Sequence, residues 1–67
     1  MNTEMANIAN IASVEAARYL GLEYTMFMNY VTTGKIVYTL KQWDKYYSKK
    51  ELDRFKNEVL NNIGLKQ

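Results

Sequence analysis

Lysine side chains between residues 35 and 50 are the clearest chemical signal in the sequence. This segment holds five lysines against one aspartate, a net charge of +4 in a chain whose total is +2. A compact cationic strip of this kind is typical of a surface that binds a polyanion. It is equally consistent with a solvated hairpin, because lysine commonly protects the edge strand of a sheet. The strip comprises Lys35, Lys41, Lys45, Lys49 and Lys50.

Catalytic and metal-binding chemistry is poorly represented. The chain contains no cysteine and no histidine, which excludes disulfides, zinc fingers and thiol or imidazole nucleophiles. The remaining carboxylates, lysines and hydroxyls form neither a nucleophile elbow nor a phosphate-binding glycine loop. We therefore expect no enzyme, no cofactor and no metal site, and acid-base catalysis by carboxylates is a distant alternative.

The length of 67 residues allows one small domain. We expect an N-terminal arm over residues 1–12 and a folded domain over 13–67. No apolar run approaches the roughly 18 residues that span a bilayer, and the N-terminus lacks the pattern of a signal peptide. The expected location is therefore cytoplasmic, with no membrane partner.

Glycines divide the middle of the chain into two short helices. Ser13 can accept from the first N–H groups of a helix, and Gly21 can adopt the left-handed conformation that ends one, so we expect a helix over about 14–20. A second helix fits residues 23–32, and Gly34 ends it.

A β-hairpin should follow. Alternating side chains predict a strand over 36–40 and a return strand over 46–48. The connection 41–45 contains no glycine, so we expect a loop of roughly four or five residues instead of a two-residue turn. For residues 1–12 a short helix, a strand and partial disorder all remain open.

The last helix has a specific start signal. Ser48 and Glu51 fit the S-x-x-E pattern of a capping box, so the helix should begin at Lys49, and Gly64 should mark its end. Its apolar stripe comprises Leu52, Phe55, Val59, Leu60 and Ile63. The whole predicted core comprises Ala17, Leu20, Leu22, Phe27, Val31, Ile36, Tyr38, Leu52, Phe55 and Val59.

The expected element order, α-α-β-β-α in one small, mainly α (α+β) domain, is the layout of a winged helix-turn-helix. The stretch 11–55, about two thirds of the chain, resembles the excisionase-like, MerR-type DNA-binding domains of phages, plasmids and other mobile elements. That family opens its first helix with E-A-A-x-x-L-G, and residues 15–21 read EAARYLG. Gly34 with Lys35, and KKELDRF at 49–55, match the family's entry to the wing and to the closing helix.

The resemblance implies that the second helix is a recognition helix. Asn29 would bond an adenine edge in the major groove, Thr25 a base or phosphate, and Tyr24 a phosphate through its hydroxyl. The lysine strip would bind phosphates as point charges. The implied recognition residues are Tyr24, Thr25, Met28, Asn29 and Thr32. The alternative is that this neutral helix face is simply solvated surface.

The implied function is sequence-specific binding of double-stranded DNA, in a transcriptional regulator or an excisionase-type recombination directionality factor associated with the nucleoid. A homodimer or cooperative multimer is expected, because one domain of this size makes few phosphate contacts. A recombinase or a host protein is a further implied partner.

Several side chains favour a different function. Glu23 would repel phosphate at a position where family members usually carry Ser, Arg or Lys. Tyr24, Met26 and Met28 are soft apolar groups of the kind found at protein interfaces. We expect Trp43 in the core, with a wedge against DNA or an anchor for a protein as its other roles. The alternative function is therefore a winged-helix scaffold that binds and inhibits a host enzyme.

Overall fold

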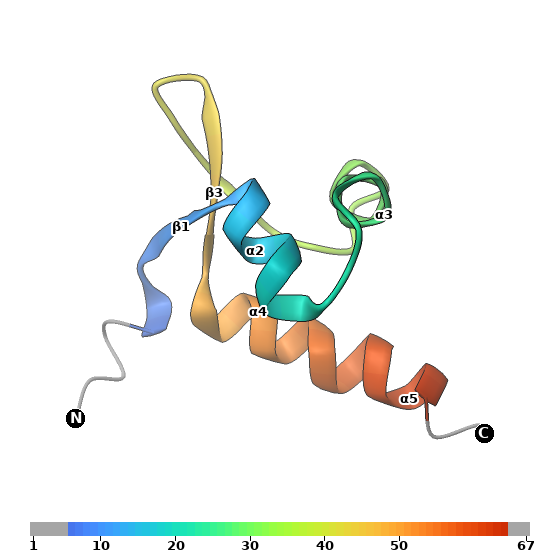
Figure 1. Ribbon diagram of the computed structural model, residues 1–67. Coiled ribbons are helices and arrows are strands. Elements are labelled where there is room, and N and C mark those ends of the chain that lie inside the picture. Colours follow the sequence, from blue (N-terminus) through green and yellow to red (C-terminus); the bar gives the residue numbers. More distant parts are fainter. Residues whose placement is uncertain (1–5, 65–67) are drawn as a thin grey trace.

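The computed structural model describes residues 6–64, and their side chains through residue 62. It is a small α+β structure with a three-stranded antiparallel sheet, shown in Figure 1. The elements are β1 (Ala9–Ala12), α2 (Ser13–Leu20), α3 (Tyr24–Thr32), β2 (Thr39–Lys41), β3 (Asp44–Ser48), α4 (Lys49–Phe55), η1 (Lys56–Leu60) and α5 (Asn61–Gly64). The last three form one uninterrupted helix with a π-helical turn at η1. Over residues 6–64, no helix is both long enough and apolar enough to cross a membrane.

The two glycine stops predicted in the middle of the chain are confirmed. Gly21 has a φ of +73°, and its N–H donates to the carbonyl of Arg18 while the N–H of Leu22 donates to that of Ala17. This pair of bonds is a Schellman motif, which satisfies the last carbonyls of α2. Gly34, with a φ of +83°, ends α3 through the same pattern of bonds.

The start of α4 is also confirmed. The Ser48 Oγ accepts from the N–H of Glu51 at 3.0 Å. The reciprocal half of the capping box is replaced, because the Glu51 carboxylate accepts from the N–H of Val37 and from the guanidinium of Arg54. The Glu51 side chain therefore makes tertiary hydrogen bonds in place of the local bond that would complete the capping box.

The sheet has the strand order β1-β3-β2, so β3 is central. β1 lies within the predicted arm and pairs with β3, which joins residues 9–12 to the same sheet as the hairpin. Predictions for residues 1–5 lie outside the described part of the chain. β2 begins at Thr39, so the strand predicted over 36–40 starts later than expected.

The turn between β2 and β3 is tighter than predicted. Lys41 pairs with Asp44 in the ladder, which leaves only Gln42 and Trp43 in the turn. Their φ values are +52° and +72°, the two positive values of a type I′ turn. The expected longer loop is wrong because the pairing register of the strands, which the sequence did not reveal, fixed the loop length.

The core is aromatic at its centre. Tyr47 is fully buried, and its ring meets that of Phe27 edge to face with centroids 5.0 Å apart. Phe55 packs in the same manner against Tyr30 at 4.9 Å. The buried set comprises Ala16, Ala17, Leu20, Phe27, Val31, Ile36, Tyr47, Leu52 and Phe55. Leu22 and Val59, both predicted to be core residues, are partly buried against this set.

Tyrosine placement was predicted wrongly. Tyr38, expected in the core, is 39% exposed, whereas Tyr47, which was not expected there, is buried. Successive strand residues face opposite sides of a sheet, so burying Tyr47 turns Tyr46 outward, and the sequence does not say which of the two points inward. Ala16 was also missed. Ile63, predicted to lie in the apolar stripe of the last helix, is a residue whose side chain the structure does not describe.

The Ser13 hydroxyl does not cap α2, contrary to prediction. No side chain caps this helix, and the Ser13 Oγ shares a hydrogen bond of 3.0 Å with the hydroxyl of Tyr47. A buried phenol needs a hydrogen-bond partner. Burial also raises the pKa of Tyr47. The Ser13 hydroxyl therefore hydrogen-bonds to Tyr47 in the core and not to the N–H groups at the start of α2.

Candidate nucleic-acid interface

The exposed face of α3 carries the predicted recognition residues. Thr25, Asn29 and Thr32 are exposed, Tyr24 is 51% exposed, and Met28 is half-buried against the core. Four of the five side chains thus face solvent as expected. Except for Tyr24, all of them line one shallow hollow, which they share with Glu23 and Met26.

The side-chain amide of Asn29 is available for hydrogen bonds to another molecule. The hydroxyls of Thr32 and Thr33 donate to its backbone carbonyl at 3.1 and 2.9 Å. Across the described residues, its side-chain amide has no hydrogen-bond partner. The amide therefore keeps both its donor and its acceptor available, which is the requirement for reading an adenine edge.

Two hairpin lysines are aligned by aromatic rings. The Lys41 ammonium lies 5.5 Å from the ring centroid of Tyr46, and the Lys45 ammonium lies 5.2 Å from that of Tyr38. Within residues 6–64, neither lysine has a carboxylate within ion-pair distance. The rings hold the ammonium groups without neutralising them, so the positive charge remains available to an anion.

The other predicted lysines lie elsewhere. Lys49 and Lys50 follow β3 at its end opposite the turn. The Lys49 ammonium forms a 3.1 Å ion pair with Asp53, and this carboxylate raises the pKa of Lys49. Lys35 is exposed between α3 and β2. The predicted lysine strip is therefore divided into a hairpin pair and three lysines nearer the ends of β3, α3 and α4.

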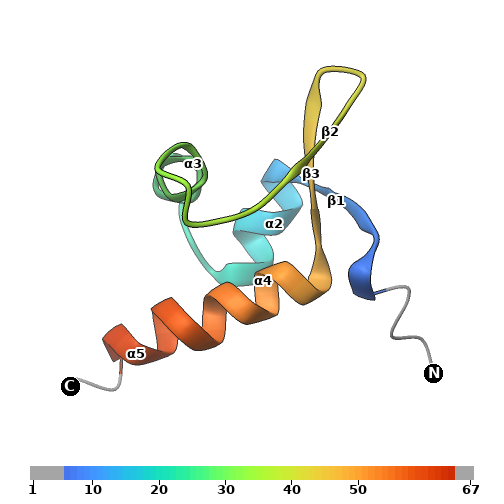
Figure 2. The ribbon, with the colours of Figure 1, turned by 180° about the vertical axis from the view of Figure 1, so that it is seen from behind.

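The N-terminus of α3 and the hairpin meet around one hollow of about 310 Å³. Tyr24 contributes from α3, Ser13 from the start of α2, and three residues from β3, which are Asp44, Lys45 and Tyr46. Figures 1 and 2 show α3 beside α2 and the hairpin tip projecting beyond α2, while α4 and α5 run below both helices. This is the place where the two predicted parts of the interface come together.

Charge on this surface is nearly balanced. Lys41 and Lys45 lie on the hairpin with Asp44, while Glu23 lies at the N-terminus of α3. The α3 face therefore offers hydrogen-bonding groups with no positive side chain, and the hairpin supplies the cations. Any anion held here must lie closer to the hairpin than to Glu23.

Trp43 lies at the tip of the hairpin and not in the core. Its side chain is 90% exposed, the highest value among the large exposed hydrophobic residues. The core prediction is wrong because the two-residue turn places this residue beyond the last ladder pair, where no other element covers it. The two remaining roles, a wedge against DNA and an anchor for a protein, stay open.

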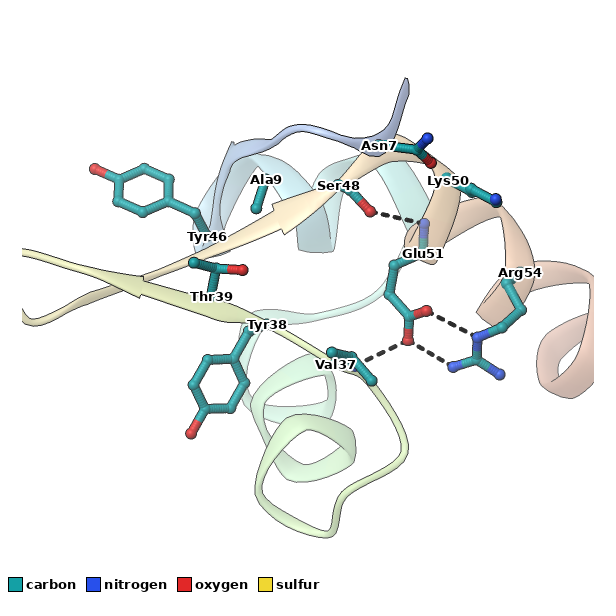
Figure 3. Close-up of a pocket in the computed structure, with 10 residues that line it drawn as sticks. All are labelled: Asn7, Ala9, Val37, Tyr38, Thr39, Tyr46, Ser48, Lys50, Glu51 and Arg54. Carbon is teal, nitrogen blue, oxygen red and sulfur yellow. Dashed lines mark hydrogen bonds and ion pairs between the residues drawn. The ribbon is translucent and has the colours of Figure 1, made fainter. Parts of the chain in front are cut away.

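A partly buried ion pair that was not predicted from the sequence lies beside a third hollow of about 370 Å³, shown in Figure 3. The Glu51 carboxylate accepts from Arg54 at 2.6 and 2.8 Å and from the N–H of Val37 at 2.9 Å. Arg54 also donates to the carbonyl of Lys35 at 3.0 Å. The i,i+3 spacing of Glu51 and Arg54 was the signal that could have revealed it.

The hydrogen bonds of this Glu51–Arg54 pair join Lys35 and Val37, which precede β2, to α4. The hydrogen bonds from Arg54 hold the pKa of Glu51 below its ordinary value. A carboxylate that stays ionised at neutral pH is a poor general acid, so the pair is suited to holding structure. No group of three metal-ligating side chains lies within residues 6–64.

Comparison with protein-family models, curated proteins and solved structures finds no match for this chain.

Proposed function

We propose that this chain is a small DNA-binding protein of the winged helix-turn-helix type. In this proposal α3 lies in the major groove and the hairpin contacts the adjoining phosphates. The supporting observation is that Tyr24 of α3 and Lys45 of the hairpin line the same hollow. One duplex could therefore contact both elements without any rearrangement of the fold.

Each contact has a separate task. Asn29 and Thr25 present hydrogen-bonding groups to base edges, which carry sequence information. Lys41 and Lys45 neutralise phosphates, which gives affinity on every sequence alike. Lys49 contributes less than its charge suggests, because Asp53 already neutralises it. The proposal thus narrows the predicted lysine strip to its hairpin pair.

Two phosphate contacts make a weak complex. Specific affinity at physiological salt requires more contacts than one copy of this surface supplies. We therefore propose that two or more copies bind adjacent sites, as a homodimer or a cooperative multimer. Occlusion or bending of the DNA would then serve transcriptional control or recombination directionality.

Salt dependence of binding tests this proposal. Neutralising two phosphates gives a slope of log K against log[salt] near about −1.8 per copy, whereas four lysines would give about −3.6. Lys41→Ala and Lys45→Ala should each reduce the slope by about 0.9. Lys49→Ala, which removes a lysine already paired with Asp53, is the matched control and should change the slope little. The measurement uses duplex fragments from the region flanking the coding sequence.

Base readout is tested by a second pair of variants. Asn29→Ala and Thr25→Ala should leave the salt slope intact while reducing the preference among sites by about 1–3 kcal/mol. If the wild-type protein is not retained on any fragment at about 50 mM salt, where electrostatic binding is strongest, the DNA-binding proposal is wrong.

A protein-binding function is the second candidate. It is favoured by the exposure of Met26 (50%) and Tyr24 (51%) at the N-terminal end of α3. Large apolar groups of this kind act as anchors at protein interfaces. In that case Tyr24→Ala and Met26→Ala would abolish complex formation with a host enzyme, and the hairpin lysine variants would mainly slow association.

A further inference from the structure

The hairpin tip is strained. Gln42 and Trp43 are the only residues other than glycine with positive φ in the described part of the chain. A bulky side chain is unfavourable in this backbone region, and Asn-Gly would form the same turn with little strain. The requirements of the turn therefore do not explain why Trp43 is present.

Packing does not explain Trp43 either. The side chain is 90% exposed, and it takes part in none of the aromatic pairs of the described residues, which all lie nearer the core. An exposed indole on a strained turn contributes nothing to the stability of the folded chain. A contact outside the chain would give this side chain a role.

The surroundings of Trp43 favour a polyanion. Lys41 on β2 and Lys45 on β3 lie on the two strands that lead to the tip, one on each side of it. Both are drawn back along the hairpin toward Tyr46 and Tyr38, which leaves the indole ahead of the charges. The hairpin thus presents an uncharged aromatic ring between two cations, which outnumber Asp44, the carboxylate that follows the ring in the sequence.

This pattern matches the minor groove of duplex DNA. The groove of undistorted B-DNA is about 6 Å wide, so a single side chain at a tip can enter it without first widening it. Phosphates line both of its walls, where two flanking lysines would meet them. Figures 1 and 2 show the hairpin projecting beyond α2, as such an approach requires.

We infer that Trp43 enters the minor groove and wedges between two base pairs, and that it bends the DNA toward the major groove. This inference rests on the proposed DNA-binding function. Aromatic rings stack on any base, so the wedge selects by deformability and not by hydrogen bonding. Pyrimidine–purine steps such as TA unstack most easily, so a TA step at the contact should be preferred.

Trp43 is the only tryptophan in the chain, so its fluorescence reports on the tip alone. The experiment titrates the protein with two duplexes of about 24 base pairs, a length that covers about two turns of DNA. The duplexes have the same composition, and only one contains TA steps. At about 50 mM salt, the TA duplex should quench the emission of Trp43 and protect it from acrylamide. End-to-end energy transfer in dye-labelled duplexes should report a bend of about 20–90°.

Variants at one position separate the wedge from the charges. Trp43→Ala should bind the TA duplex about tenfold to a hundredfold more weakly, lose the bend and keep the salt slope. Trp43→Phe should retain both the bend and most of the affinity. Trp43→Gly also removes the indole but relieves the strained φ. If this variant loses the bend while its circular dichroism matches that of the wild type, the loss of bending does not arise from unfolding.

The outcomes distinguish the two proposals. If the wild type binds and bends neither duplex, the DNA-binding function and the wedge are both wrong. If the wild type binds but its emission is unchanged and Trp43→Ala bends DNA as the wild type does, the wedge alone is wrong. If, in addition to that second result, Trp43→Ala loses binding to a protein partner, the hairpin tip is assigned to protein binding.

Discussion

The packed body and the hairpin use the same kinds of residues for opposite purposes. In the body, Phe27, Tyr47 and Phe55 are completely buried and meet neighbouring rings edge to face. In the hairpin, Trp43 is 90% exposed on a strained turn. Aromatic residues therefore stabilise the fold in one region and are exposed to solvent in the other.

The comparison extends to charged groups. In α4, Arg54 and Lys49 are paired with carboxylates. On the hairpin, the ammonium groups of Lys41 and Lys45 lie over aromatic rings, and the described residues offer them no carboxylate. This difference is the basis of our proposal that the body provides stability and the hairpin provides binding. Substitutions in each region test that division.

The largest effect is expected from the body. Phe55→Ala leaves a cavity beside Tyr30 and should lower the free energy of unfolding by about 3–5 kcal/mol, enough to unfold a domain of this size. Urea or thermal denaturation followed by circular dichroism measures it. Trp43→Ala is the matched aromatic truncation on the hairpin and should leave the midpoint nearly unchanged. Equal losses in the two variants would contradict the division.

A smaller effect is expected at the ion pair between β2 and α4. Glu51→Gln removes the negative charge and one of the two acceptor oxygens that Arg54 and the Val37 N–H share, and should lower the free energy of unfolding by about 1–2 kcal/mol at pH 7. The pKa of Glu51 is lower in the folded chain than its ordinary value of 4.5. Its carboxylate therefore stabilises the fold above about that pH, and the stabilisation is lost as the pH falls through the folded pKa.

The difference between wild type and Glu51→Gln should accordingly shrink as the pH falls below the ordinary carboxyl pKa of 4.5. Denaturant titrations at several pH values check it. Glu58→Gln is the control, because Glu58 binds the same arginine at 2.9 Å but its side chain is 64% exposed. A gap for Glu51→Gln that stays constant with pH would show that the carboxylate charge is not responsible.

The next effect tests a local signal. Ser48→Ala removes the cap of α4 and should lower the free energy of unfolding by about 1 kcal/mol. Ser48→Asp keeps an acceptor for the N–H of Glu51 and should retain most of the stability. An unchanged denaturant midpoint in Ser48→Ala would mean that the 3.0 Å bond contributes nothing.

The smallest effect should have the opposite sign. Trp43→Gly places glycine at a φ of +72°, and should raise the free energy of unfolding by roughly 0.5 kcal/mol, since relieved strain slightly exceeds the added chain entropy. Gly34→Ala is the reverse change at a φ of +83°. A Cβ there meets no atom within 4 Å, so its expected cost of about 1 kcal/mol is strain alone. A destabilised Trp43→Gly would show that the indole packs on the fold.

Local chemistry is what the sequence by itself determined. The ends of α2 and α3 at Gly21 and Gly34, and the start of α4 after Ser48, depend on bonds between residues at most five positions apart. Such bonds need no distant residue, so residue type and spacing are enough to predict them where no tertiary contact competes for the side chain, as one does at Ser13. The exposed face of α3 followed from helical periodicity in the same way.

Strand register is what only the tertiary structure decided. Packing Tyr47 against Phe27 fixed which of two adjacent tyrosines points inward, and the resulting ladder left Gln42 and Trp43 as the whole turn. The same contact drew the hydroxyl of Ser13 away from its helix. These outcomes depend on residues about 20 to 34 positions apart, and a side-chain pattern with a period of two has no means of choosing between registers that differ by one residue. The position of Trp43, on which the proposed contact with DNA rests, was therefore set by how a tyrosine packs at the other end of the same strand.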